Sequence, residues 1–333
     1  MLGNRSNFRA FTQAPPHLGL RHTQVSLQGS EEVSVLRVSP RDRECPLLSL
    51  LLSLRRHYSV PFVPAIPGLD GFPGLLLHSH FFRRKEPFAG LSEVVLVGGG
   101  ASGVDLALLL SDAVTGHVFL SHRGAPVRGL PSNVAQVPPI TRVDGPRVVF
   151  EDGSEARPEA LLLCTGYRAR FPFLPLGRLG LREAEHGLAP LYRHLLPPAH
   201  PTLFLLGLCQ LICPFPHFHC QTLFALAVLS GRCPLPSAAE MEAEAQAELE
   251  GYLAAGGEPR HFLRLQERQW GYTDGLAQAA GSPSLPAFIR EIWDAARGHR
   301  SQNVSRYRGR NYRMLGPDAW EVVEDSDQDG QAK

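Results

Sequence analysis

The sequence has few cysteines, no long apolar run and no excess of charge of either sign. Six cysteines are spread over 333 residues without a secretory leader, so we expect reduced thiols in an intracellular, cytoplasmic protein, with peripheral membrane association left open. The apolar tract of residues 46–54 is too short to cross a bilayer, which takes roughly 20 residues. A formal net charge of +1 gives no general attraction to nucleic acid.

Composition divides the remaining chain unevenly. Residues 1–57 show no clear periodicity, and we expect irregular structure there. Residues 58–82 carry repeated prolines, which favour an extended connector over a helix. Residues 83–165 read as an ordered α/β domain, and residues 321–333 as an acidic, disordered tail.

A strand–helix–strand pattern runs through the ordered domain. "EVVLVG" predicts a buried strand, "GVDLALLLSDAV" a helix and "HVFLSHR" a second strand, with "ALLLCTGY" as a further apolar strand. Strand, helix and strand joined by a tight glycine turn are typical of a parallel βαβ unit. The fold class predicted is therefore α/β.

The glycine turn has the spacing of a dinucleotide-binding motif, Gly98-x-Gly100-x-x-Gly103. The first glycine permits the tight turn, the second lets a pyrophosphate approach the backbone, and the third lets the helix pack closely on the strand. The helix N-terminus adds free N–H groups and a positive dipole end. The motif predicts dinucleotide binding, and the alternative is a glycine turn with a purely structural role.

The residue at the end of the next strand indicates which dinucleotide. Sites for NAD usually place an acidic side chain there, about 20 residues on, against the ribose 2′-hydroxyl. This chain has Arg123 instead, 20 positions after Gly103. A guanidinium suits a 2′-phosphate, so we predict NADPH. The alternative is an ordinary surface arginine in a loop.

Further motifs, in a fixed order, surround this domain. "FPGLLLHSHFF" contains Phe72-x-Gly74-x-x-x-His78-x-x-x-Phe82, and "CTGYRARFPFL" follows the last strand. "HPTLFLLGL", "CPFPHFHCQTLFALAVLSGRCPLPS" and "QWGYTDGLAQAAG" come later. With these motifs, residues 58–320 resemble the flavin-containing monooxygenases, a family of class B flavoprotein monooxygenases.

The resemblance implies a fold, a chemistry and a set of site residues. It implies two dinucleotide-binding domains, with an NADPH domain inserted in an FAD domain to which residues 58–82 and 166–320 belong. NADPH reduces FAD in that family, and the reduced flavin reacts with O2 to oxygenate a small amine or sulfide. The NADPH contacts implied are Gly98, Gly100, Ser102, Gly103 and Arg123. The resemblance also implies Phe72, Gly74 and His78 at the domain junction, and Gly207 and Gln221 near FAD. For His78 the alternative is a buried histidine with one backbone partner.

One departure from the family concerns the N-terminal region. Family members begin with a glycine turn that cradles the FAD pyrophosphate, and residues 1–57 contain none. The FAD domain is therefore expected to be incomplete, as in a truncated or alternatively spliced product or a sequence with a wrong 5′ end. The alternative function is a catalytically inactive NADP(H)-binding fragment.

Other patterns suggest ligands but fit packing or surface roles better. A Cys/His cluster could suggest zinc, yet it lacks a C-x2-C pair and lies among apolar residues, which favours core packing. Its members are Cys209, Cys213, His217, His219 and Cys220. "DSDQDG" imitates the start of a calcium loop but predicts a solvated tail. "RSQNVSRYRGRNYR" resembles RNA-binding segments but is expected to form a surface turn, without nucleic acid as a partner.

A capping box marks one helix start. Ser237 with Glu240 three residues on predicts that a helix begins there. We expect an inward stripe of Met241, Ala245, Leu249 and Tyr252 along this helix, with its glutamates in solvent.

Overall fold

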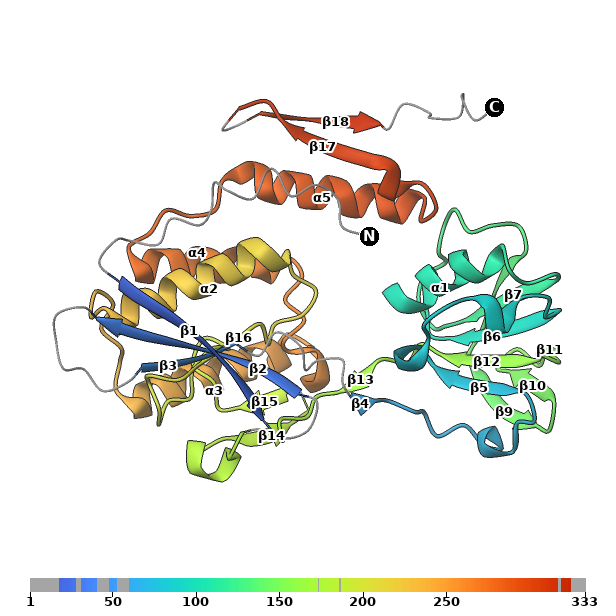
Figure 1. Ribbon diagram of the computed structural model, residues 1–333, viewed down its shortest axis with the longest axis horizontal. Coiled ribbons are helices and arrows are strands. Elements are labelled where there is room, and N and C mark those ends of the chain that lie inside the picture. The colour runs from blue at the N-terminus through green and yellow to red at the C-terminus, as the bar shows by residue number, and fades with distance from the viewer. Residues whose placement is uncertain are drawn as a thin grey trace. The chain divides into compact units, whose positions relative to one another are not determined.

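The computed structural model describes residues 18–27, 31–40, 48–52, 60–172, 174–185, 187–316 and 319–324. The chain forms two compact units, each built from two separate stretches of sequence (Figure 1). The glycine-turn unit comprises His57–Ala169 and Pro286–Lys333. The second unit comprises Met1–Arg56 and Arg170–Leu285. The α/β fold class is confirmed, while the grouping of residues 58–82 and 286–320 differs from the sequence interpretation.

A parallel sheet forms the centre of the glycine-turn unit. Its strand order is β5-β12-β6-β7-β8, and every neighbouring pair runs parallel. The strands are β5 (Leu75–His78), β12 (Ala160–Leu163), β6 (Glu93–Val97), β7 (His117–Ser121) and β8 (Val134–Val137). Helix α1 (Ala101–Ser111) connects β6 to β7. This is the predicted βαβ unit, and its apolar strands suit a sheet covered on both faces.

Alternate residues of β6 enter two different cores. Val94 and Leu96 pack with Leu110 of α1, whereas Val95 packs with Phe150 on the opposite face. Figure 1 shows α1 above the sheet and a smaller antiparallel sheet, ordered β11-β10-β9, below it. The smaller sheet consists of β9 (Ile140–Asp144), β10 (Arg147–Phe150) and β11 (Glu155–Ala156). Burial of each such side chain contributes roughly 1.5–3 kcal/mol, so both faces hold β6 in place.

Residues outside the predicted NADPH domain complete this unit. β4 (Val60–Pro61) pairs antiparallel with β13 (Tyr167–Arg168). The C-terminal part contains α5 (Ala287–Gln302) and the antiparallel pair β17 (Arg310–Met314) and β18 (Trp320–Glu324). The tail predicted from residue 321 onward is therefore ordered as far as 324, because β17 provides a pairing strand. The calcium-loop-like segment 325–330 lies outside the described residues.

The C-terminal part is bonded to the parallel-sheet core. Val304 is buried among the residues that α1 covers, and its N–H donates to the carbonyl of Arg128. Nη2 of Arg308 donates to both carboxylate oxygens of Asp105 in α1, at 2.9 Å to Oδ1 and 2.8 Å to Oδ2. The arginine-rich stretch 300–313 thus contains the end of α5 and strand β17, where we predicted only a surface turn.

The second unit contains a mixed sheet with the order β1-β2-β3-β16. Its strands are β1 (Leu18–Leu27), β2 (Glu31–Pro40), β3 (Leu48–Leu52) and β16 (Phe204–Leu206), and only β3 and β16 pair in parallel. The strands before residue 57 differ from the irregular structure predicted there. The β-branched residues Val33, Val35 and Val38 favour extended chain, and the sequence interpretation missed this signal.

Helices supply most of the core of the second unit. These are α2 (Pro214–Leu229), α3 (Ala238–Ala254) and α4 (Arg268–Ala280). A short antiparallel pair, β14 (Arg182–Ala184) and β15 (Gly187–Ala189), accompanies them. Phe224 of α2 and Leu276 of α4 pack with Phe204 in one cluster. No helix in the described parts of the chain is long and apolar enough to span a membrane.

The predicted capping box at the start of α3 is confirmed. Ser237 accepts from the backbone N–H of Glu240, whose carboxylate accepts from the backbone N–H of Ser237. Met241 is buried, while the rest of the predicted inward stripe is half-buried. The stripe is therefore shallower than expected.

Candidate functional site

A cavity of about 490 Å³ opens at the carboxyl ends of the parallel strands in the glycine-turn unit. Its lining comes from residues 97–100 at the end of β6, residues 121–125 at the end of β7, and a connector including Phe62, Pro64 and Ile66. Pro139, Ile140 and Thr165 complete the lining. A volume of this size lies in the range of small-molecule and cofactor sites. Parallel α/β sheets bind ligands beyond this edge, at the carboxyl ends of their strands.

Two glycines of the motif are required by close packing. A Cβ on Gly98 would lie 2.5 Å from the carbonyl oxygen of Cys164, and its φ of +113° disfavours any other residue. A Cβ on Gly103 would lie 1.8 Å from the carbonyl oxygen of Gly98. These two positions therefore let α1 approach β6 and β12 closely.

Gly100 has a different environment. No heavy atom lies within 4 Å of a Cβ built there, and its φ of −72° is ordinary. It is the N-cap of α1, and among the described residues no side chain caps this helix end. Ser102, in the first turn, is exposed. Open space beside uncapped N–H groups fits a diphosphate, so this end of α1 meets the requirements of a dinucleotide cradle.

Arg123 contributes to the lining of this cavity. It is exposed and lies two residues after the end of β7. The lining residues within the described chain include no Asp or Glu. The cavity can therefore bind an anionic group at Arg123, because no carboxylate in its lining would repel that group or pair with the guanidinium.

Some lining residues escaped the sequence interpretation. Thr165 donates through its hydroxyl to the carbonyl of Phe62, and the N–H of Phe62 donates to the carbonyl of Gly166. These bonds hold the connector beside the strand ends. They join positions about a hundred residues apart in sequence, and no local signal indicates them.

Cys164 lies against the glycine turn but is no candidate nucleophile. Burial raises the pKa of its thiol to about 12, although a hydrogen bond with Ser79 acts in the opposite direction. The thiol stays protonated at neutral pH, so the residue serves as packing beside Gly103.

Phe72, Gly74 and His78 all lie within the glycine-turn unit. Phe72 is buried in the core between the two sheets, and a Cβ on Gly74 would lie 2.4 Å from the carbonyl oxygen of Glu159. His78 is 5% exposed. Together they fix β5 against β12.

The ring of His78 has two backbone partners. Its Nε2 lies 3.1 Å from the carbonyl oxygen of Gly166, and its Nδ1 accepts from the N–H of His80. This pattern assigns the proton to Nε2. Burial lowers the pKa of His78, against the hydrogen bond to Gly166, which raises it. The histidine therefore holds the end of β5 to the segment after β12 as a neutral donor.

Gly207 and Gln221 bond to each other in the second unit. The buried amide of Gln221 accepts from the N–H of Gly207 at 3.1 Å and donates to the hydroxyl of Tyr272 at 2.9 Å. That hydroxyl donates to the carbonyl of Arg193. Gln221 thus holds the connection between β16 and α2, and both its amide oxygen and its amide nitrogen have a partner within the protein.

The Cys/His cluster around α2 packs into the second unit. Among the described residues no three His, Cys, Asp or Glu side chains are grouped to hold a metal ion. His217 is 1% exposed, stacks on Tyr272 with ring centroids 5.0 Å apart, and neither ring nitrogen has a described partner. Burial, with a smaller effect from His194, lowers its pKa to about 3.

The low pKa of His217 predicts acid sensitivity that one substitution removes. In the unfolded chain His217 binds a proton below about pH 6.5, whereas in the folded chain it does so only near pH 3. The free energy of unfolding is therefore highest above pH 6.5 and falls as the pH drops below that value. From pH 7 to pH 5 the loss is about 2 kcal/mol. His217→Phe keeps the stacking and should abolish this loss in urea unfolding at both pH values. The exposed His117→Phe serves as control, and an unchanged pH dependence in His217→Phe would contradict the assignment.

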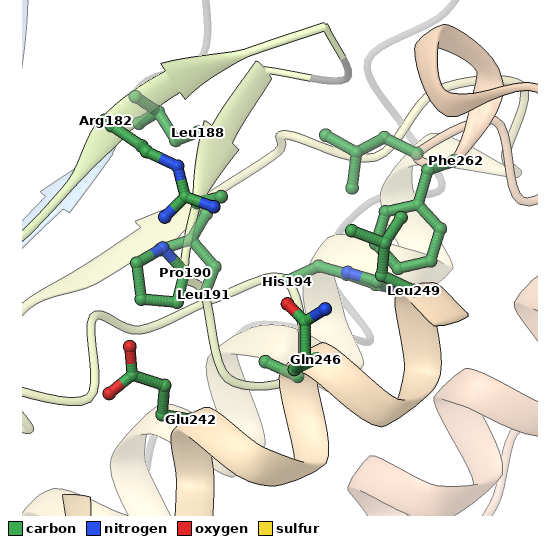
Figure 2. A pocket seen from close by; sticks show the side chains of 12 residues that line it. Arg182, Leu188, Pro190, Leu191, His194, Glu242, Gln246, Leu249 and Phe262 are labelled. Carbon is green, nitrogen blue, oxygen red and sulfur yellow. The ribbon is translucent and has the colours of Figure 1, made fainter. Parts of the chain in front are cut away.

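A smaller cavity lies within the second unit. Figure 2 shows Arg182, Glu242 and Gln246 around it, with His194 and Phe262 at its side. Its volume of about 60 Å³ accommodates on the order of four waters. It is too small for a dinucleotide, so it is not the counterpart of the cavity beside the glycine turn.

His194 beside this cavity contacts an acidic residue of α3. Its Nε2 lies 3.0 Å from Oε1 of Glu248 but is poorly directed for a hydrogen bond. Burial raises the pKa of Glu248, but the contacts with His194 and nearby arginines outweigh it and leave the pKa below its ordinary value. This pair fastens α3 to the loop before β16.

Solved structures share the fold. The S-allyl-L-cysteine S-oxygenase from Allium sativum aligns with a TM-score of 0.71 and 28% identity, over 87% of this chain and 65% of that one. Tmm from Pelagibacter sp. strain HTCC7211 aligns with a TM-score of 0.67 and 25% identity, over 91% and 68%. These likenesses support the predicted fold of two dinucleotide-binding domains.

Curated relatives extend the comparison. Trimethylamine monooxygenase of Pelagibacter ubique (strain HTCC1002) is 29% identical over 77% of this chain and 57% of its own length. Flavin-containing monooxygenase FMO GS-OX-like 2 of Arabidopsis thaliana is 33% identical over 81% and 60%. The chain thus spans somewhat over half the length of the curated relatives it matches.

Residues 124–326 of this chain match the sequence model of a protein family. The match begins immediately after Arg123, so the glycine turn lies outside the matched residues, whereas part of the cavity lining lies within them. The glycine turn and the family match therefore come from separate parts of the sequence. By this match the chain is a member of the flavin-binding monooxygenase-like family.

Proposed function

We propose that the glycine-turn unit binds NADP(H) and that the protein acts as an NADPH- and FAD-dependent monooxygenase. One observation carries the nucleotide assignment: the open face of Gly100, at the uncapped start of α1, leads into a cavity that also reaches Arg123. A diphosphate needs the first feature, and a 2′-phosphate needs the second.

The residues have distinct binding roles in this proposal. The N–H groups at the start of α1, with the exposed Ser102, would hold the diphosphate, while Gly98 and Gly103 allow the turn to form. Arg123 would pair with the 2′-phosphate. The apolar connector beside the strand ends limits the access of water to the bound nucleotide.

The cofactors supply the chemistry when bound: NADPH provides a hydride, and FAD provides the flavin that reacts with O2. For FAD we retain Gly207, at the end of β16, as a backbone contact, and we assign Gln221 to hold Gly207 in position. The protein's own contribution is to bind, orient and exclude water.

The proposed substrates are small amines or sulfides. Two similar proteins bear the names trimethylamine monooxygenase and S-allyl-L-cysteine S-oxygenase. The compound in the first name is an amine, and the compound in the second is a sulfide. Both classes present a soft lone pair. The absence of an acid/base pair among the residues that line the described cavity agrees with chemistry supplied by cofactors.

Removal of the Arg123 guanidinium tests the nucleotide assignment. Arg123→Ala should weaken NADPH binding by about 1.5–3 kcal/mol, the range for hydrogen bonds to charged groups. NADH binding should change little, because NADH lacks the 2′-phosphate that Arg123 is proposed to bind. Fluorescence titration of both nucleotides measures the two losses, with Arg142→Ala, on the exposed part of β9, as a control. Equal losses for NADPH and NADH would remove Arg123 from this role.

A further inference from the structure

The loop that carries Arg123 is held by a side chain from the neighbouring strand. Gln136 of β8 accepts from the N–H of Val127 at 2.7 Å and donates to the carbonyl of Val127 at 2.9 Å. The amide therefore pairs with Val127 as a neighbouring strand would. This pairing fixes the far end of the loop.

His122 fixes the near end of the same loop. Its Nε2 lies 3.0 Å from Oε1 of Gln136, and its Nδ1 accepts from the N–H of Gly124 at 3.1 Å. Because Nδ1 accepts, the proton belongs on Nε2, which donates to Gln136. The ring also lies against Gly99, where an added Cβ would approach it to 2.8 Å. His122 thus links the glycine turn to Gln136.

Arg123 lies between these two anchors. Its guanidinium forms no hydrogen bond or ion pair with any residue in the described parts of the chain, so none of these residues orients the side chain directly. The backbone that carries it is held through His122 on one side and Val127 on the other. Loss of either anchor would free the backbone and raise the entropic cost of ordering it around a ligand.

We propose that Gln136 is a positioning residue that sets the preference for a 2′-phosphorylated nucleotide, acting through the loop from His122 to Val127. This inference rests on the proposed binding of NADP(H). Gln136 is uncharged and absent from the cavity lining, so it acts on the phosphate through the loop that carries Arg123. Binding of a nucleotide without the 2′-phosphate does not use Arg123 and therefore depends less on Gln136.

Titrations of NADP⁺ and NAD⁺ into the full chain test the proposal. Gln136→Ala should weaken NADP⁺ binding about tenfold, corresponding to one poorly ordered loop side chain and its backbone, and should weaken NAD⁺ binding much less. His122→Phe, which keeps a ring beside Gly99 but removes both nitrogens, should shift the preference in the same direction. Gln278→Ala, at an exposed position on α4, is the matched control and should change neither affinity.

A double variant separates positioning from general structural support. Because Gln136 acts through Arg123, Arg123→Ala combined with Gln136→Ala should bind NADP⁺ no more weakly than Arg123→Ala alone. Equal losses of NADP⁺ and NAD⁺ in Gln136→Ala, or a further loss in the double variant, would overturn the inference. If Arg123→Ala selectively weakened NADP⁺ binding but Gln136→Ala and His122→Phe did not, the role of Gln136 would be overturned while the proposed binding of NADP(H) would stand. An unmodified chain that binds neither nucleotide would overturn the proposed function as well.

Discussion

Replacement of Gly103 by alanine is expected to destabilise the glycine-turn unit and abolish nucleotide binding. The new Cβ would lie 1.8 Å from the carbonyl oxygen of Gly98 and 3.4 Å from Cβ of Cys164. The first contact is with backbone, which cannot move aside like a flexible side chain. Helix α1 must therefore shift away from β6, which disrupts the packing of Val104 and Leu110 against the sheet.

The expected cost is large for so small a change. Overpacking of a tight core typically costs about 1–3 kcal/mol, and the shift of α1 also displaces its N-terminus from the turn. We expect a lower midpoint of urea unfolding, with no detectable NADP⁺ binding. Gly251→Ala in α3 is the control: no atom lies within 4 Å of its Cβ, so it should stabilise by up to about 1 kcal/mol. Unfolding of Gly103→Ala at the midpoint of the unmodified chain would contradict this packing.

The features that could be predicted from sequence depend on residues that lie close together in the sequence. The glycine turn, the βαβ order and the capping box at Ser237 each occupy a short window in which spacing reflects backbone geometry directly. Gly98 and Gly103 could be assigned because only glycine permits the backbone contacts that their positions require. The open face of Gly100 follows from the same spacing.

The features that escaped prediction depend on distant pairings. β5 belongs to the parallel sheet because Leu75–His78 pairs with β12, more than eighty residues later. Arg308 pairs with Asp105 across some two hundred residues. The amide of Gln136 has no sequence signal, since its role depends on how β8 and the loop after β7 meet in space. Local patterns carry no information about such contacts.

Replacement of Gly100 by alanine should have the opposite signature from Gly103→Ala. Its φ of −72° suits any residue, and no heavy atom lies within 4 Å of the new Cβ. The fold should therefore tolerate the methyl group at a cost of about 0.5–1 kcal/mol, because alanine is a poorer N-cap than glycine. The space that it fills is where the proposed diphosphate approaches the N–H groups of α1, so nucleotide binding should be lost while the protein stays folded.

The size of the loss in nucleotide affinity follows from the hydrogen bonds that the methyl group would break. Each hydrogen bond to a charged group contributes about 1.5–3 kcal/mol, and displacement of the diphosphate breaks at least two of them. The dissociation constant for NADP⁺ should rise by roughly a hundredfold or more. NAD⁺ has the same diphosphate, so its affinity should fall by a similar factor, in contrast to the selective loss expected for Arg123→Ala.

The most direct test of the nucleotide site is calorimetric titration of NADP⁺ into the unmodified chain and into Gly100→Ala, with a thermal melt of each protein. We predict saturable binding to the unmodified chain, a loss of roughly a hundredfold in the variant, and cooperative melting of both proteins at midpoints that differ by no more than about 4 °C. Equal affinity of the two proteins for NADP⁺ would contradict the account, because the open face of Gly100 would then not be where the dinucleotide binds.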